Sequence, residues 1–197
     1  MRRFVLTGAP GAGKTTIVDE LRRRGWAVVA EAATDIITAQ QARGVAAPWQ
    51  EAGFVDAVAR LQRERREAPG AYASVQVHDR SPLCTLALAR YQGRPAGRVL
   101  VEEVERVLRD GTYQREVFLV QPLGFVTATA ARRIGYAESL AFARVHEEVY
   151  RAHGHRLVVV PPAPVRTRVA LVEAHLRRFA GLPSDPAEGV PDPIYLT

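Results

Sequence analysis

Short apolar runs alternate along this chain with longer stretches in which apolar residues recur at helical spacing. The apolar runs have strand length, and Gly or Pro residues bound many of the stretches between them. This pattern predicts strands at about 3–7, 26–30, 73–78, 116–120 and 156–160. It predicts helices at about 14–24, 32–43, 50–67, 82–91, 97–110 and 137–153, and a last helix that ends near residue 179.

The alternation of strands and helices is typical of right-handed βαβ units. We therefore expect an α/β fold: a five-stranded parallel sheet with helices on both faces. One domain should cover residues 1–180, with a lid within 121–137, and a loosely ordered tail rich in Pro and Asp should follow at 181–197. Because such folds bind ligands beyond the carboxyl ends of their strands, we expect the functional residues there.

The bulk composition fits a single globular domain. The chain has 197 residues, of which 47% are hydrophobic, and this supplies one substantial core. No apolar run approaches the roughly 18–20 residues that cross a bilayer. One cysteine, Cys84, excludes an internal disulfide framework and a multi-cysteine metal site. We expect a cytoplasmic protein that does not contact membranes.

The charge balance is basic, with a net charge of +6, which raises the question of a nucleic-acid partner. The arginines are scattered among acidic residues along the expected helices, as on solvated helix faces, so we do not expect nucleic-acid binding. A positive field also attracts polyphosphates. Of the 27 Lys and Arg residues only one, Lys14, is a lysine, and a compact ammonium suits a tight phosphate-binding loop better than the planar fork of arginine.

The segment Gly8–Thr15 matches the pattern G-x-x-x-x-G-K-[ST] between the first strand and the first helix. Its glycines let backbone N–H groups wrap a phosphate, and the helix N-terminus adds partial positive charge. Lys14 should reach the β- and γ-phosphates, and the Thr15 hydroxyl should ligate Mg²⁺. We predict a site for ATP or GTP with Mg²⁺, formed by Gly8, Ala9, Pro10, Gly11, Ala12, Gly13, Lys14, Thr15 and Thr16.

A second cluster follows the third strand. Asp79 ends that strand and is suited to hold Mg²⁺ directly or through water, and Arg80 comes next. The alternative is an ordinary salt bridge followed by a Ser81 helix cap with Pro82 in the first turn. With the glycine-rich loop upstream, the functional interpretation is favoured.

Two acidic residues compete for a role at the acceptor side. Glu31 directly follows the second strand, where a carboxylate could orient or deprotonate a hydroxyl that attacks the γ-phosphate. It could instead only stabilise the helix dipole. Asp35, one helical turn further on, is the rival for the same role.

The stretch 121–136 contains no acidic residue but carries Arg132 and Arg133. Mobile lids often deliver arginines to the charge that develops in phosphoryl transfer, so both are candidate catalytic residues. The alternative is a pair of exposed loop arginines.

These motifs together resemble one family. They are the segment 7–16, the Glu31 helix, Pro48-Trp49 with Phe54, Asp79-Arg80-Ser81, Val117-Phe118-Leu119 and Tyr150-Arg151-Ala152-His153-Gly154. The chain is similar over about residues 2–180 to the single-domain P-loop group labelled "AAA domain" ATPases, and to the ribosylnicotinamide kinase domain of bifunctional NAD regulators.

The resemblance implies a P-loop NTPase fold of nucleotide-kinase type rather than a hexameric motor. It assigns Lys14 and Thr15 to phosphate and Mg²⁺, Asp79 and Arg80 to the strand-end pair, and Glu31 to the acceptor side. Relatives often carry an Asp just before the lid arginine, whereas Thr129-Ala130-Ala131 precede Arg132 here. The lid assignment and the acceptor therefore stay open.

The activity expected from these observations is ATP-dependent transfer of the γ-phosphate to a small hydroxyl-bearing metabolite, for example a nucleoside or nucleotide. The alternative is a regulatory ATPase, GTPase or nucleotide-sensing switch without a small-molecule acceptor. A kinase acting on RNA or DNA is a third hypothesis. The sequence leaves open whether the protein is a monomer or a homodimer.

Overall fold

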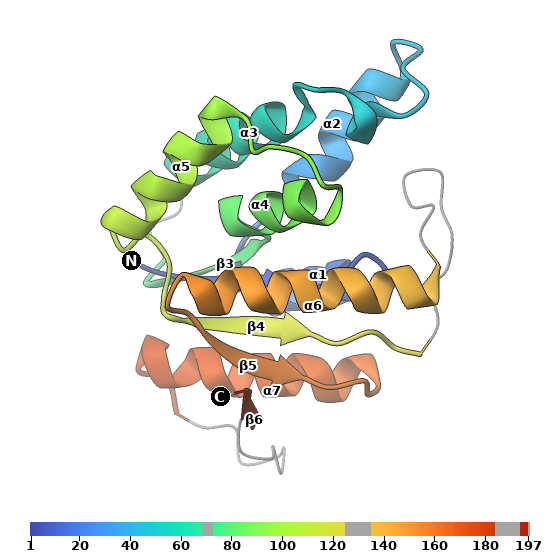
Figure 1. The fold of residues 1–197 in the computed structure, drawn as a ribbon. Helices are drawn as coiled ribbons and strands as arrows, with labels where there is room; N and C mark the ends of the chain where they lie inside the picture. The colour runs from blue at the N-terminus through green and yellow to red at the C-terminus, as the bar shows by residue number, and fades with distance from the viewer. Residues whose placement is uncertain (69–72, 125–134, 184–193, 197) are drawn as a thin grey trace.

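The computed structural model describes residues 1–68, 73–124, 135–183 and 194–196 (Figure 1). Its sheet has the strand order β2-β3-β1-β4-β5-β6. The strands are β1 (Arg2–Thr7), β2 (Ala27–Val29), β3 (Val75–Asp79), β4 (Glu116–Val120), β5 (Arg156–Val160) and β6 (Ile194–Leu196). The first five are mutually parallel, which confirms the predicted α/β fold and parallel sheet.

The sixth strand was not predicted from the sequence. Ile194–Leu196 pairs antiparallel with β5, opposite residues Leu157–Val159, and extends the sheet at its edge. The segment falls within the expected loose tail. Three residues are too few to show a period, so only the pairing with β5 defines this strand.

The helices of the described chain cover both faces of the sheet (Figure 1). They are α1 (Lys14–Arg23), α2 (Ala32–Gln41), α3 (Phe54–Glu67), α4 (Pro82–Tyr91), α5 (Arg98–Arg109), α6 (Tyr136–Ala152) and α7 (Val165–Ala180). A short 3₁₀ turn, η1 (Pro48–Gln50), precedes α3. The helix predicted from residue 50 therefore begins only at Phe54, after Gly53.

The alternation of side chains along the strands divides the core into two layers. Phe4 and Leu6 of β1 pack on the face covered by α1 and α7, whereas Val5 packs on the face covered by α4 and α6. Beyond α4 lie α3 and α5, and α2 packs against α3 (Figure 1). Within the described ranges, no helix has the length and apolar character that crossing a membrane would require.

The position of β1 determines where the site forms. This strand lies between β3 and β4, with Leu6 paired to Asp79 and Thr7 paired to Leu119. Because the three strands are parallel, the segments that follow them emerge at the same edge of the sheet. The loop after Thr7 is thereby placed beside Asp79.

Candidate functional site

The loop between β1 and α1 has the backbone conformation that its glycines permit. Gly8, Gly11 and Gly13 have φ values of 129°, 85° and 84°, which side chains rarely adopt. A Cβ at Gly8 would also collide with the carbonyl oxygen of Val120 in β4. Gly13 caps the N-terminus of α1, so the loop leads directly to the positive end of a helix dipole.

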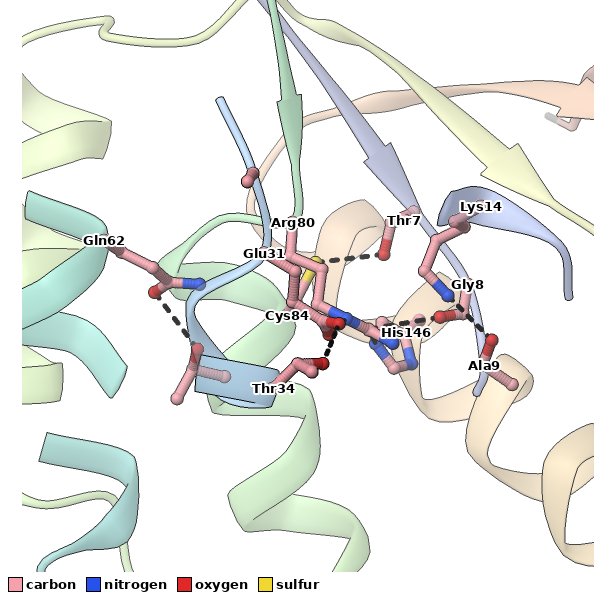
Figure 2. A network of polar contacts seen from close by, with 12 residues as sticks. Thr7, Gly8, Ala9, Lys14, Glu31, Thr34, Gln62, Arg80, Cys84 and His146 are labelled. Atoms are coloured by element: carbon pink, nitrogen blue, oxygen red, sulfur yellow. Dashed lines mark hydrogen bonds and ion pairs between the residues drawn. The ribbon is translucent and has the colours of Figure 1, made fainter. Parts of the chain in front are cut away.

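Lys14 is folded into this loop. Its side chain is buried, and Nζ donates a hydrogen bond to the carbonyl oxygen of Ala9 at 2.8 Å (Figure 2). Burial, with repulsion from Arg80, lowers the pKa of Lys14 to about 7, although Asp79 and Glu31 oppose the shift. An anion in the loop would favour the charged form of this amine.

Arg80 connects three parts of the site. Its φ of 76° is the only left-handed value of a non-glycine residue in the described chain, and its N–H donates to the Leu6 carbonyl at 3.1 Å. Its Nε forms an ion pair with Glu31, and Nη1 donates to the carbonyl oxygen of Gly8 at 3.2 Å (Figure 2). Strained backbone of this kind is often found at functional sites.

The conformation of Arg80 is supported from α6 by His146, which the sequence analysis did not single out. Nδ1 of His146 lies 2.9 Å from the carbonyl oxygen of Phe142, and Nε2 lies 3.3 Å from Nη1 of Arg80. Burial and the charge of Arg80 lower the pKa of His146 to about 3, so the ring is neutral. The proton then lies on Nδ1, and Nε2 accepts from Arg80. No spacing in the sequence indicates this contact, because α6 and Arg80 are far apart along the chain.

The two acidic rivals, Glu31 and Asp35, have different surroundings in the structure. One carboxylate oxygen of Glu31 is paired with Arg80, and the other accepts from the Thr34 hydroxyl at 2.7 Å. Burial alone would raise the pKa of Glu31, but the charges of Arg80 and Lys14 lower it to about 2. Asp35 instead pairs with Arg65 of α3, and 59% of its side chain is exposed.

Asp79 is the residue best placed for a metal. It is buried, and its Oδ1 has no hydrogen-bond partner in the described part of the chain. Burial raises the pKa of the Asp79 carboxyl, and the charge of Lys14 opposes this shift. Further positive charge nearby, such as a bound cation, would favour the ionised form. An orphaned carboxylate oxygen and the Thr15 hydroxyl, which lines the same cleft, are the oxygen ligands that Mg²⁺ prefers.

The described residues contain no group of three or more His, Cys, Asp or Glu side chains that could hold a metal by themselves.

A cleft of ≈ 760 Å³ joins the phosphate loop to a second region. At one end lie Pro10, Gly11, Gly13, Lys14, Thr15 and Thr16, and Glu31, Asp79 and Arg80 also line the cleft. The other end, which we call the aromatic end, is lined by Trp49, Phe54, Val58, Gln62, Thr85, Leu88, Tyr91, Gln92 and Phe142. Tyr91 and Phe142 stack there with their ring centroids 4.6 Å apart.

Few residues of the aromatic end were identified from the sequence. Trp49 and Phe54 are named in the sequence analysis only among the motifs that resemble the family. Gln62, Tyr91 and Phe142 have the spacing of ordinary core residues and gave no signal. Only the packing of α3, α4 and α6 around one cleft brings them together.

Ser81 and Cys84 belong to a buried chain of hydrogen bonds behind the site. The Ser81 hydroxyl lies 2.6 Å from the Tyr150 hydroxyl, which lies 3.1 Å from the Cys84 sulfur. That sulfur is 3.2 Å from the hydroxyl of Thr7. Ser81 does occupy the N-cap position of α4, with Pro82 after it, but its side chain bonds Tyr150 rather than the helix backbone. These contacts connect β1, α4 and α6 at the strand ends.

The lid expected within 121–137 falls mostly on residues that the structure does not describe. Arg132 and Arg133 lie outside the described residues. Both arginines stay predictions. Of the other predicted site residues, Gly8, Ala9 and Ala12 form the loop itself, and Ala9 and Ala12 are fully buried.

A glycine-rich loop between a strand and a helix, one buried lysine and a carboxylate on the adjacent strand define the class of P-loop nucleotide-binding α/β proteins. The chain belongs to the AAA domain family, whose model matches residues 3–168. This confirms the family expected from the motifs. No curated protein matches the sequence.

Solved structures share this fold at low identity. NadR in complex with NAD and AMP-PNP superposes with a TM-score of 0.62 at 15% identity, over 93% of this chain and 51% of NadR. NadR in complex with NR gives 0.59 at 16% identity, over 95% and 54%. The deoxyadenosine kinase from M. mycoides gives 0.50 at 16% identity, over 89% and 99%. The likeness is one of fold, and this chain spans about half the length of NadR.

Proposed function

We propose that the protein is a kinase that transfers the γ-phosphate of ATP to a hydroxyl group of a small, uncharged acceptor of the nucleoside class. The observation that carries the proposal is the position of Glu31 and Arg80. They lie in one continuous cleft that also includes Lys14 and the aromatic end. An NTPase that acts only on water has no need of an aromatic cavity beside its phosphate loop.

The aromatic end supports an acceptor that contains a flat ring. Trp49, Phe54, Tyr91 and Phe142 offer ring faces, and Gln62 and Gln92 offer amide groups for polar edges. The two structural relatives are consistent with this chemistry, since NadR has been solved with NR and the other is a deoxyadenosine kinase.

The charges in the cleft favour a nucleoside over a nucleotide. No arginine or lysine lines the described part of the aromatic end. Arg80, a cation that lines the same cleft, is already paired with Glu31. The phosphate group of a nucleotide acceptor would need a cation of its own, in addition to those that bind ATP, as phosphate sites usually provide.

The chemistry follows from the positions of the charges. The acceptor hydroxyl oxygen forms a bond to the γ-phosphorus while the bond from that phosphorus to the oxygen of ADP breaks. The hydroxyl proton passes to the carboxylate of Glu31. With a pKa of about 2, Glu31 is a weak base, but the loose transition state of phosphoryl transfer releases the proton late and needs mainly orientation.

Lys14 and the N-terminus of α1 would stabilise the charge on the phosphates. Mg²⁺, held by Thr15 and Asp79, would supply further neutralisation of the polyphosphate when bound.

The test is an acceptor screen with ATP labelled at the γ-phosphate, run against nucleosides, nucleoside monophosphates and sugars. We expect label on a nucleoside product, and we expect Lys14→Ala to abolish it while circular dichroism shows an intact fold. Label released only into inorganic phosphate would contradict the kinase proposal and support the regulatory NTPase. Label on monophosphates alone would contradict the uncharged acceptor.

A further inference from the structure

Arg168, in the first turn of α7, is a buried cation that has no counter-charge among the residues that the structure describes. Its exposed fraction is 2%, and it is among the largest fully buried side chains of the described chain. Nη2 donates to the carbonyl oxygen of Gln121 at 3.1 Å, and Nε has no hydrogen-bond partner among the described residues. No described carboxylate forms an ion pair with it, whereas buried Arg66 pairs with Glu103 and Arg80 pairs with Glu31.

The guanidinium of Arg168 lies against the phosphate loop. A Cβ at Gly13 would stand 2.9 Å from Nη1 of Arg168, so the last glycine of the motif leaves room for this group. The same Cβ would be 3.6 Å from Leu123, which lines the cleft. Arg168 comes from α7 and does not itself line the cleft.

This arrangement is electrostatically unfavourable in the nucleotide-free protein. Burial disfavours the charged form and lowers the pKa of Arg168, and Lys14 adds a second buried cation at the next position after Gly13. A buried charge is costly unless a partner compensates it. The only polyanion that this loop is built to bind is the phosphate chain of a nucleotide.

We propose that Arg168 is a positioning residue for the nucleotide, and that its counter-charge is the polyphosphate bound by the loop to which Gly13 belongs. Arg168 lies between Gly13 of the phosphate loop and the carbonyl group of Gln121, and so it holds the loop in place. Its charge also adds a positive potential to the phosphate site. The inference rests on nucleotide binding at residues 8–15, as the proposed function does, and not on the identity of the acceptor.

The test compares wild type with Arg168→Met, which keeps volume and removes charge, and with Arg168→Lys, which keeps charge. Calorimetry gives the affinities for ATP, ADP and AMP. We expect Arg168→Met to weaken ATP binding about tenfold, ADP binding less and AMP binding least, because Coulomb attraction scales with the charge of the ligand. Arg168→Lys should restore most of the ATP affinity. The matched control is Arg166→Met, an exposed arginine two residues away, which should bind all three ligands as wild type does.

Equal losses for ATP, ADP and AMP would show a merely structural role and overturn the proposal, as would unchanged ATP affinity in Arg168→Met. If Arg168→Met does not fold, Arg168→Lys decides, since a tenfold loss of ATP affinity in this charge-preserving variant would also contradict the proposal. Absence of ATP binding by the wild type would instead refute the proposed function itself.

Discussion

Arg80 and Glu31 follow neighbouring strands, β3 and β2, and their side chains meet in an ion pair at the carboxyl edge of the sheet. The Thr34 hydroxyl donates to the second oxygen of the carboxylate, and the ion pair holds the first one in place. The ion pair also holds Arg80 in a backbone conformation that non-glycine residues avoid. A carboxylate fixed in this way, in a cleft that also contains Lys14, is well placed to orient a hydroxyl group.

The first prediction concerns Glu31. Glu31→Gln keeps the shape of the side chain but removes the proton acceptor and the charge that pairs with Arg80. We expect turnover to fall by about 10²–10⁴-fold, the range for loss of a general base, while ATP affinity changes little. Steady-state kinetics with the acceptor found in the screen, together with ATP titration, measures both.

Asp35→Asn is the matched control for that variant. Asp35 lines the same cleft one helical turn away but is paired with Arg65 and largely exposed. We expect its turnover to stay within about threefold of wild type, as for a surface ion pair. A larger loss in Asp35→Asn than in Glu31→Gln would reverse the assignment of the two acidic residues.

The second prediction concerns the close contact of the phosphate loop with β4. Gly8→Ala places a Cβ against the Val120 carbonyl oxygen at a φ of 129°. We expect it to lower the free energy of unfolding by about 2–4 kcal/mol, because strain and overpacking combine. Gly25→Ala is the control: its φ of 88° is also left-handed, but no atom of the described residues lies within 4 Å of the added Cβ. It should cost only about 1–2 kcal/mol. Denaturant unfolding measures the free energy of unfolding of both variants. An equal decrease in the two would show that the contact with Val120 adds nothing to the cost.

How much of this site the sequence could predict depends on how local each signal is. One contiguous pattern contains Lys14, Thr15 and the glycines, so the position of the phosphate loop could be predicted from spacing alone. Asp79 ends an apolar strand, so its place at the edge of the sheet could be predicted in the same way. The parallel sheet followed from the alternation of elements.

The rest depends on tertiary contacts. Arg168 and Gly13 are brought together only because α7 packs beside α1. His146 contacts Arg80 for a similar reason, since α6 crosses the site from the other face. The antiparallel strand β6 also arises from pairing rather than from its own sequence. A single sequence carries no periodic signal for such long-range contacts.

The third prediction is a pH dependence of nucleotide binding. In the nucleotide-free protein the pKa of Lys14 is lowered from 10.5 to about 7, whereas bound phosphate favours the charged amine. At pH 8 much of Lys14 is neutral, so ATP binding must take up a proton, and affinity should fall by up to about tenfold per pH unit above 7. Calorimetry in two buffers with different ionisation enthalpies counts the protons. ATP binding without proton uptake at pH 8 would contradict the lowered pKa of Lys14.

The same shift predicts how Lys14 affects stability. Between pH 7 and 10.5 the unfolded chain binds more protons at this residue than the folded chain, so its contribution to folding becomes more favourable as pH rises. We expect Lys14→Met to be more stable than wild type near pH 7 in the absence of nucleotide. The difference should shrink as pH approaches 9. A difference that is constant between pH 7 and 9 would show that Lys14 does not titrate in this range.

The last prediction concerns the orphaned oxygen of Asp79. Asp79→Asn keeps the volume of the side chain and removes a buried carboxylate, so the nucleotide-free fold should be retained. What it removes is the anionic oxygen suited to a hard cation. In the wild type we expect Mg²⁺ to strengthen ATP binding, and in Asp79→Asn we expect that enhancement to shrink by at least about tenfold. Asp19→Asn, another carboxylate of the cleft, which pairs with Arg22, is the control and should keep the enhancement. Equal Mg²⁺ enhancement in all three proteins would mean that Asp79 does not hold the metal, and the buried oxygen would need another partner.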